Sequence, residues 1–501
     1  MIIADSIEEV SEALDETVGM EGTNGSKPGD DPVGLKLKDL LKDGTSKALG
    51  MIAIASLNKR NNLFLNILAK GLPNTGLDDY QIKDILGRLS AMDSNNNPDS
   101  IGVGEREGRI YSRLVAQRHC GLAHGIGRSG NIAEVQPKAP GSAIIQKLTC
   151  KMAKQMTKVA GLKVPKDWKA TVLPIATGMA LAFSIKAIRH TRPEEHTYVL
   201  MTRIDQKSCI KSIEQANCSL RIIPNRVDGE EIATDLKMVE EMVVKLNKRI
   251  VAVVATTSCF APRICDRLVK ICQILKPYNI PLVVNNAYGL QSSEAINQLN
   301  EAIKSGLIAA IVQSTDKNFM VPVGGSIILA KNDLIKSIEN LYPGRANISP
   351  LLDLFITFLA LGRSGYCRLL AEQKSCFAYF KMRLAELSQS SLPIKLLATP
   401  RNDISLAISL EQASIGGRHP LGSYLFLRGV SGARVVPASS KRQVEGHQFV
   451  NFGQHHDAYT YETYLTVASA IGQTTSEIDL FIERLCSYFE SSPSSPDRIM
   501  G

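Results

Sequence analysis

The chain has 501 residues, which is too long for one ordinary domain, so two or three domains are expected. Apolar residues make up 44% of it, but the longest apolar runs are only strand-sized, so we expect neither a membrane span nor a signal peptide. The formal net charge is +9, although residues 1–34 hold nine acidic residues and one lysine, so the remainder carries +17. A basic body of this kind favours polyanionic partners such as RNA.

Composition changes along the chain predict five parts. Residues 1–46 are acidic and rich in small polar residues, which is typical of a disordered extension. Residues 47–165 combine helical patterns with a long glycine-rich stretch. Residues 166–350 are expected to form a large domain, residues 351–490 a smaller α+β domain, and the Ser/Pro-rich residues 491–501 a flexible tail.

The large domain has the pattern of an α/β fold. Short apolar runs alternate with charged helical stretches such as residues 236–247. This alternation predicts a mainly parallel sheet with helices on both faces. The expected strands include residues 198–201, 250–255, 280–284 and 309–312.

Ten cysteines and eight histidines are scattered without a CxxC pair. We therefore expect no metal site and no disulfide framework. Free thiols in a reducing cytoplasm fit this pattern.

Two of the expected strands end in polar residues that can do chemistry. Lys317 follows the run 307–312, and Asn285 ends the run 280–284. Ligands bind at the carboxyl ends of strands in open α/β sheets. A lysine there can form a Schiff base with pyridoxal phosphate (PLP), and a polar group on the neighbouring strand can meet the pyridine nitrogen. The alternative is a surface lysine in a strand-to-loop turn.

A small-residue turn after the first expected strand could supply the phosphate end of that site. Residues 175–180, which include Ala176 and Thr177, open the helical stretch 181–189. Free N–H groups at a helix start bind anions. Gln206 follows another strand and could join the cofactor's surroundings, and Arg345 is presented by a Tyr-Pro-Gly-Arg turn suited to bidentate phosphate contact.

Two glycine-framed loops precede the large domain. Residues 125–130 match GxGxxG, but no apolar strand leads into them, so the dinucleotide interpretation fails. Arg128, Ser129 and Gln136 could instead make an anion-binding loop, with a flexible glycine loop as the alternative. Residues 102–109 read GVGEREGR, which is either a surface ion-pair cluster or a phosphate-binding arginine beside a glutamate.

Several longer strings make the sequence recognisable as a whole. It contains MDSNN at 92–96, GVGEREGR at 102–109, HGIGRSG at 124–130 and RIDQKS at 203–208. TTSCFAPR (256–263), VNNAYG (284–289), DKNFMVPVGG (316–325), YPGRA (342–346) and VSGARVVP (430–437) follow in order. From about residue 50 to 485 the chain closely resembles the O-phosphoseryl-tRNA:selenocysteinyl-tRNA synthases of eukaryotes and archaea.

The resemblance implies a fold-type I PLP enzyme of selenocysteine biosynthesis, usually a cytoplasmic homotetramer with composite active sites. Lys317 would carry the cofactor, and Asn285 would face its ring nitrogen. Arg106, Ala176, Thr177 and Gln206 would surround it. Arg128, Ser129, Gln136 and Arg345 would bind the substrate phosphate.

The same resemblance implies contacts to tRNA(Sec). Arg428 matches an arginine implicated in reading the acceptor end. Lys304 stands near where relatives often have a tRNA-contacting arginine. Glu105 is interpreted as a substrate filter, because its charge would repel the free carboxylate of phosphoserine but not the ester of phosphoseryl-tRNA. Pairing of Glu105 with Arg106 or Arg109 is the alternative.

The implied reaction is a β-elimination of phosphate followed by addition of selenium from selenophosphate. Two other interpretations remain open at this point. One is a PLP-dependent lyase or desulfurase that acts on free amino acids, and the other is a catalytically silent RNA-binding protein on the same fold.

Overall fold

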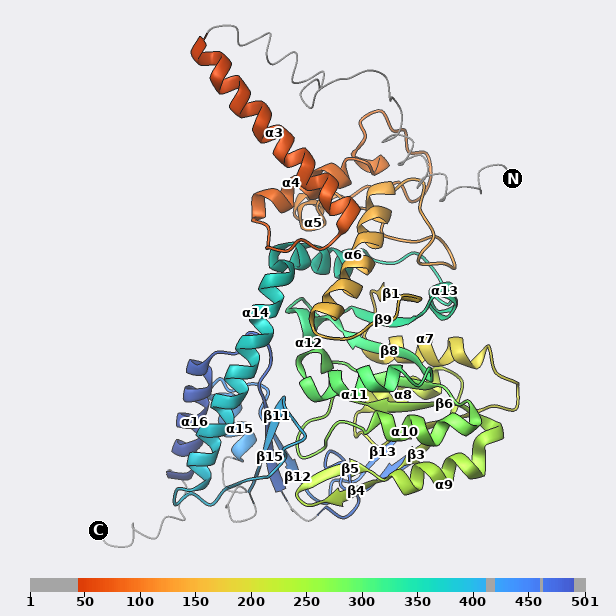
Figure 1. Ribbon diagram of the computed structural model, residues 1–501, viewed down its shortest axis with the longest axis vertical. Helices are drawn as coiled ribbons and strands as arrows, with labels where there is room; N and C mark the ends of the chain where they lie inside the picture. Colours follow the sequence, from red (N-terminus) through yellow and green to blue (C-terminus); the bar gives the residue numbers. More distant parts are fainter. Residues whose placement is uncertain (1–43, 411–419, 460–462, 491–501) are drawn as a thin grey trace. The chain divides into compact units, whose positions relative to one another are not determined.

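The computed structural model describes residues 44–410, 420–459 and 463–490 (Figure 1). The expected extension 1–46 lies outside these residues except for its last three positions, and the expected tail 491–501 lies wholly outside them. By contacts the chain divides into residues 1–69 and residues 70–501. The five-part division made from the sequence stays a prediction.

The first unit is described by one helix, α3 (Gly44–Lys70). Leucine and alanine are frequent in its sequence, and these residues lose little freedom in a helix. Residues 58–62, which read NKRNN, are part of the same helix.

The second unit begins with α4 (Asp79–Ser90), which opens with a capping box made by Asp78 and Gln81. A long irregular stretch follows, interrupted by η1 (Ser94–Asn96) and α5 (Arg113–Arg118). The amphipathic pattern expected at residues 146–159 belongs to α6 (Pro140–Val159), which buries Leu148, Met152 and Met156. The proline stands in the first turn, where its missing N–H has no intrahelical partner to lose.

A seven-stranded sheet forms the centre of this unit, in the order β1-β9-β8-β7-β6-β2-β3. All neighbouring pairs are parallel except those made by β9, which is antiparallel to both β1 and β8. The expected mainly parallel α/β sheet is therefore confirmed. The strands are β1 (Trp168–Leu173), β2 (Tyr198–Thr202), β3 (Ser219–Ile223), β6 (Ile250–Thr256), β7 (Leu282–Asn285), β8 (Ile308–Ser314) and β9 (Ser326–Lys331).

The helices between these strands form two groups. The helix α7 (Thr177–Arg189) connects β1 to β2, and α8 (Lys207–Gln215) connects β2 to β3, so both connections run towards the β3 edge of the sheet. The helices α9 (Leu236–Leu246), α10 (Leu268–Leu275) and α11 (Ser293–Ile303) lie in the connections that lead to β6, β7 and β8, which run towards the β1 edge. Because crossovers between parallel strands are right-handed, the two groups cover opposite faces of the sheet. Both faces of β6 are consequently apolar, and all seven of its residues are buried.

Smaller elements complete the large domain. A hairpin of β4 (Asn225–Asp228) and β5 (Glu231–Thr234) extends from the sheet region. The short helices η2 (Asn247–Arg249), η3 (Lys276–Tyr278), η4 (Gly289–Gln291) and α12 (Thr315–Phe319) occupy connections, and α13 (Asn332–Asn340) follows β9.

The helix α14 (Ser349–Ser388) leads from the large domain to the C-terminal one (Figure 1). It consists of two helical stretches that meet at a kink at Gly362, whose φ of +58° and ψ of −172° are not helical. By length and apolar composition α14 could cross a membrane, but it packs against α6 and α16 (Thr475–Glu490) as a core helix does.

The C-terminal domain has a four-stranded antiparallel sheet in the order β10-β11-β15-β12. Its core is formed by Phe380, Leu465, Ile478 and Leu485, from α14, the sheet and α16. The elements are β10 (Lys395–Leu396), β11 (Ser405–Ser409), α15 (Leu421–Leu427), β12 (Arg434–Pro437), the hairpin β13 (Arg442–Val444) and β14 (His447–Phe449), and β15 (Thr463–Ala468). The smaller α+β domain expected from the sequence is present.

Candidate active site

Four strands that run in the same direction deliver most of the predicted cofactor residues to one edge of the sheet. Asn285 is the last residue of β7, and Lys317 lies in α12, directly after β8. Ala176 is the N-cap of α7, shortly after β1, and Gln206 is the N-cap of α8, shortly after β2. Parallel strands place their carboxyl ends together, so these residues occupy the position where open α/β sheets bind ligands.

The backbone around Lys317 is fixed by buried amides. Asn318 Nδ2 donates to the backbone oxygens of Ala287 and Ser314, at 2.8 Å each. Gln291 Nε2 donates to the oxygen of Lys317 at 2.6 Å, and Gln291 Oε1 accepts from the backbone N–H of Ile471. Both amides escaped the sequence analysis. They hold the lysine's backbone to the neighbouring strand and to the C-terminal domain, whereas its side chain is exposed.

Asn285 has one bonded and one unbonded end. Its Nδ2 donates to Cys209 Sγ at 3.3 Å, while its Oδ1 is buried and meets no hydrogen-bond partner among the described residues. A buried acceptor without a partner costs about 1–3 kcal/mol, so this oxygen calls for a donor from a ligand. Cys209 lies in the first turn of α8, and the sequence analysis did not select it.

The start of α7 has the features of an anion cradle. Its N-cap is Ala176, whose methyl group cannot bond the free N–H groups of the first turn. Gly178 lies so close to α8 that a Cβ there would be 3.2 Å from Cβ of Ser208. The positive ends of two helices thus approach each other at Ala176 and Gln206, which favours a negatively charged group between them.

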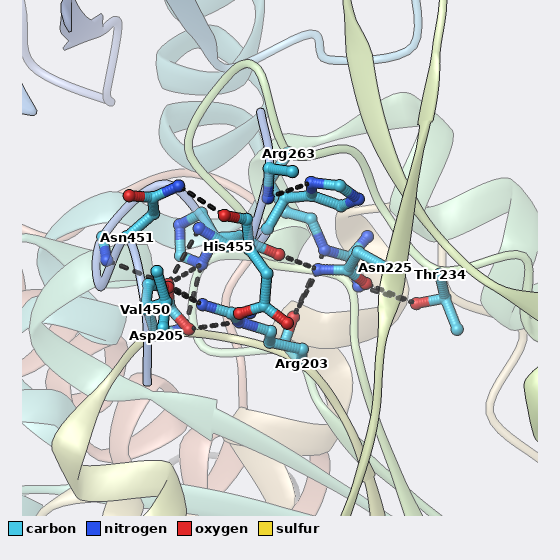
Figure 2. A network of polar contacts seen from close by, with 12 residues as sticks. Arg203, Asp205, Asn225, Thr234, Arg263, Val450, Asn451 and His455 are labelled. Atoms are coloured by element: carbon cyan, nitrogen blue, oxygen red, sulfur yellow. Dashed lines mark hydrogen bonds and ion pairs between the residues drawn. The ribbon is translucent and has the colours of Figure 1, made fainter. Parts of the chain in front are cut away.

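A network of buried charges supports the residue before Gln206 (Figure 2). Asp205 accepts from Arg203 Nε at 2.9 Å and from the backbone N–H groups of Gly453 and His455, both at 2.8 Å. Arg203 also pairs with Asp457, at 2.6 Å. The strand end that carries Gln206 is therefore tied to residues 450–457 of the C-terminal domain.

The same network extends to a second buried ion pair. Arg263 donates to Asp266 at 2.6 Å, and both side chains are fully buried. Asp266 also accepts from the hydroxyls of Thr202 and Thr234, at 2.6 Å and 2.5 Å.

Burial lowers the pKa of His455 to about 4, although the Asp205 charge opposes the shift, so this ring is neutral at pH 7.

One predicted phosphate residue, Arg345, lies in a different place, beside Arg106. A cavity of about 380 Å³ is lined by residues of the loop 105–110, by Ala123 and His124, and by Arg345. Arg106 and Arg345 both face it. Burial, and then the charge of Arg106, lower the pKa of Arg345, so an anion between the two guanidinium groups would stabilise both.

Arg345 is positioned by the glycine loop. It donates to the backbone oxygen of His124, and its Nε is buried without a hydrogen-bond partner among the described residues. Ile126 and Ala346 exchange backbone hydrogen bonds at 3.0 Å each. Gly125 has φ +69°, and a Cβ there would lie 2.3 Å from the oxygen of Ala346, so only glycine fits.

The rest of the glycine loop is exposed. Arg128 pairs with Glu134 at 2.9 Å, Ser129 is exposed, and Gln136 Oε1 accepts from the N–H of Lys138 at 3.5 Å. None of these three predicted phosphate ligands lines the 380 Å³ cavity. The described residues 44–124, which precede the loop, hold helices and irregular backbone but no strand.

Glu105 pairs with Arg106 at 3.2 Å, and their side chains are 84% and 67% exposed. Pairing with Arg106 is the role that the sequence offered for Glu105 as the alternative to a substrate filter. The neighbouring Glu107 pairs with Lys138 at 2.6 Å. The sequence analysis assigned no role to His124, which is buried against Ser94, with Nε2 3.0 Å from its hydroxyl.

The two predicted tRNA contacts lie on separate elements. Lys304, at the end of α11, pairs with Glu301 at 2.6 Å. Arg428, at the end of α15, lies 3.5 Å from the ring centroid of Tyr424 and is exposed. Among the described residues no group of three His, Cys, Asp or Glu side chains could hold a metal ion.

Comparison with known proteins identifies the family. The family model described as O-phosphoseryl-tRNA(Sec) selenium transferase matches residues 92–490. The chain belongs to this family. A relative of that name from Dictyostelium discoideum is 45% identical, over 87% of this chain and 95% of its own length. One from Methanocaldococcus jannaschii is 33% identical, over 86% and 95%.

Solved structures agree. This family member superimposes on the crystal structure of an archaeal O-phosphoseryl-tRNA(Sec) selenium transferase with a TM-score of 0.77 and 28% identity, covering 92% of this chain and 99% of that one. A Lactobacillus brevis glutamate decarboxylase gives a TM-score of 0.56 at 12% identity, covering 84% and 95%. An Oryza sativa TDC solved with PLP gives 0.52 at 12%, covering 88% and 98%. The last two matches show a shared fold.

Proposed function

We propose that this protein converts O-phosphoseryl-tRNA(Sec) to selenocysteinyl-tRNA(Sec), with selenophosphate as the selenium donor. The observation that carries the proposal is the family match over residues 92–490, which takes in every predicted site residue. The ten cysteines are all free thiols, which suits a reducing compartment, and we place the activity in the cytoplasm.

The residues at the sheet edge fit PLP. The unpartnered Oδ1 of Asn285 suits a protonated pyridine nitrogen, and the uncapped start of α7 at Ala176 and Thr177 suits the cofactor phosphate. Gln206 would contact the ring's polar substituents, and Arg106 would come from the phosphate end. When bound, PLP supplies an electron-withdrawing ring that stabilises negative charge at the substrate α-carbon.

Lys317 has two tasks in this proposal. Its Nζ would hold the cofactor covalently. As a free amine at the sheet edge, the same Nζ would be the base that removes the substrate α-proton. Because Gln291 and Asn318 fix the backbone at this point, only the side chain of Lys317 has to move.

Arg345 and Arg128 would hold the phosphate of the phosphoseryl group. Charge-assisted hydrogen bonds from guanidinium groups stabilise the phosphate as it leaves the β-carbon with the bonding electrons. Ser129 and Gln136 would add donors from the same loop. Selenium from selenophosphate then adds to the β-carbon, its P–Se bond breaks as water takes up the phosphoryl group to give inorganic phosphate, and a proton returns to the α-carbon.

Within one chain, Arg106 and Arg345 line the 380 Å³ cavity, whereas the predicted cofactor residues at the sheet edge, which are Ala176, Thr177, Gln206, Asn285 and Lys317, do not. We propose that the two groups meet across copies of the chain, in the homotetramer that the resemblance implies. Each active site would then combine the Lys317 end of one chain with the arginines of another.

Recognition of tRNA(Sec) is assigned to the basic surface. Arg428 would approach the acceptor end, and its Cζ lies over the ring of Tyr424, 3.5 Å from the centroid. Lys304 would contact a phosphate as a point charge. Binding through phosphates should weaken steeply as salt rises, and Arg428→Ala should impair tRNA-linked turnover without changing PLP binding.

Turnover of the purified protein with O-phosphoseryl-tRNA(Sec), with and without selenophosphate, tests the proposal. We expect phosphate release and, with selenophosphate, selenocysteinyl-tRNA. Release of sulfide from free cysteine without phosphate release from the tRNA would favour the lyase or desulfurase. Binding of tRNA without either reaction would favour the silent RNA-binding protein.

A further inference from the structure

The thiol of Cys209 lies directly against the amide that would face the cofactor ring. Asn285 Nδ2 donates to Cys209 Sγ at 3.3 Å. The thiol in turn donates to Gln206 Oε1 at 3.9 Å, a long contact that lies within the range for sulfur. Asn285 and Cys209 are each only 4% exposed. A directed chain of hydrogen bonds therefore runs from Asn285 through sulfur to Gln206.

The direction of this chain determines which end of the amide is left for a ligand. Because Nδ2 is engaged by the sulfur, the free end is Oδ1, the buried acceptor without a partner among the described residues. An acceptor oxygen can bond a pyridine nitrogen only when that nitrogen carries a proton. The opposite amide orientation would present Nδ2, which bonds an unprotonated nitrogen.

Cys209 is unsuited to act as a nucleophile. Its burial raises the pKa of the thiol to about 11, and the side chains of Ser208, Lys317 and Asn285 oppose the shift only in part. At neutral pH the group is a thiol, so it can donate to Gln206 and accept from Asn285 at the same time.

We propose that Cys209 is a positioning residue that orients the Asn285 amide so that its oxygen faces the cofactor's ring nitrogen and keeps that nitrogen protonated. The inference rests on the proposed function, because it needs PLP at this site. A protonated ring withdraws electrons more strongly than a neutral one, so the thiol would tune the chemistry without touching the reacting atoms.

The direct test is the protonation state of the bound cofactor. Wild-type protein, Cys209→Ala and Cys209→Ser are reconstituted with PLP labelled with ¹⁵N in the ring, and solid-state NMR separates protonated from unprotonated nitrogen. We expect a protonated signal in wild type, a mixture of both signals in Cys209→Ala, and recovery of the protonated signal in Cys209→Ser, whose hydroxyl can also accept and donate. The affinity for PLP should fall roughly three- to tenfold in Cys209→Ala, as for one hydrogen bond.

Two controls isolate the amide. Cys218→Ala removes another buried thiol of the large domain, whose sulfur contacts the oxygen of Ala216 at 3.6 Å, and should leave the ring signal unchanged. In an Asn285→Asp background both side-chain oxygens are acceptors, so adding Cys209→Ala should not alter the protonation state.

The outcomes separate this inference from the proposed function. An unprotonated ring in wild type would overturn the role of Cys209, as would an unchanged protonated signal in Cys209→Ala. In either case, covalent attachment of PLP to Lys317, read as the mass of the borohydride-reduced peptide, would leave the cofactor site standing. Absence of that attachment in wild type would overturn the PLP part of the proposed function itself.

Discussion

The cofactor end and the phosphate end of the proposed site are built in contrasting ways. At the cofactor end Asn285, Cys209 and Asp205 are at most 4% exposed and bonded across neighbouring elements. At the phosphate end Arg128 and Glu105 are 51% and 84% exposed and pair with residues of their own loops. Exposed ion pairs contribute only about 0–1 kcal/mol, so ligands can readily rearrange them. The cofactor end of the proposed site would then be rigid, and the phosphate end would adapt to the substrate.

The largest effect is expected at Lys317. Lys317→Ala removes both the covalent link and the proposed base, so turnover should be lost while the fold is kept, because the side chain is exposed. Turnover of O-phosphoseryl-tRNA(Sec) and circular dichroism together check this. A variant with full activity would show that Lys317 has no role in the mechanism. It would also contradict the assignment of the chemistry to the cofactor end.

Stability should distinguish the two ends directly. Asp205→Asn leaves Arg203 with a weakened partner inside the protein, and breaking a buried pair typically costs about 3–5 kcal/mol. Glu134→Gln breaks the exposed pair with Arg128 and should cost at most about 1 kcal/mol. The shift in urea midpoint measures both. Similar shifts for the two variants would contradict the contrast.

Acid should weaken the cofactor end through His455. The pKa of His455 is about 4 in the folded protein against an ordinary value of 6.5, so the unfolded chain binds a proton first as pH falls. Stability is thus complete above pH 6.5 and is lost as pH falls from 6.5 to 4, by about 3 kcal/mol in total. Unfolding free energies across this range would measure the loss. His455→Gln should flatten the slope, and an unchanged slope would assign the acid sensitivity to other groups.

At the phosphate end, Arg345→Ala and Arg128→Ala should each reduce kcat/KM roughly tenfold or more, as for one charge-assisted hydrogen bond. Steady-state kinetics with O-phosphoseryl-tRNA(Sec) measure the loss. An analogue with a leaving group other than phosphate serves as the control. An equal loss on that analogue would mean that the arginines shape the loop rather than bind the phosphate.

The smallest effect is expected at Glu105. Glu105→Gln removes the charge and keeps the shape, so free phosphoserine should bind better while tRNA-linked turnover stays near normal. The 84% exposure of the Glu105 side chain weakens the repulsion, so the gain should be about threefold rather than the larger factor of a buried pair. Competition by free phosphoserine measures it. Unchanged competition would support simple pairing with Arg106.

The sequence predicted the cofactor end better than the phosphate end for a physical reason. Apolar runs mark buried strands, and Lys317 and Asn285 follow such runs directly, so their position at the sheet edge follows from local pattern. Arg345 meets His124, which lies 221 residues away, and no periodicity encodes that contact. Its turn suggested a phosphate contact, and the resemblance assigned that contact to the substrate phosphate.

Cys209 shows where a local signal was present but insufficient. Its spacing with Ile210 and Ile213 marks the buried face of α8, which is visible in the sequence. The contact with Asn285 depends on how α8 and β7 meet across 76 residues. Likewise, the sequence shows Arg203 and Asp205 as charged residues, but it does not reveal that both are buried.

The bonds of Asp205 also bear on how the protein is made. Its partners include the N–H groups of Gly453 and His455, about 250 residues later in the chain. The ion-pair partner of Arg203, Asp457, is a similar distance away in the sequence. Domains fold as the ribosome releases them, but this strand end cannot be completed until almost all of the chain has emerged. The nascent large domain therefore holds the Arg203–Asp205 pair without several of its hydrogen-bond partners, and completion of this strand end becomes a late step in the life of the polypeptide.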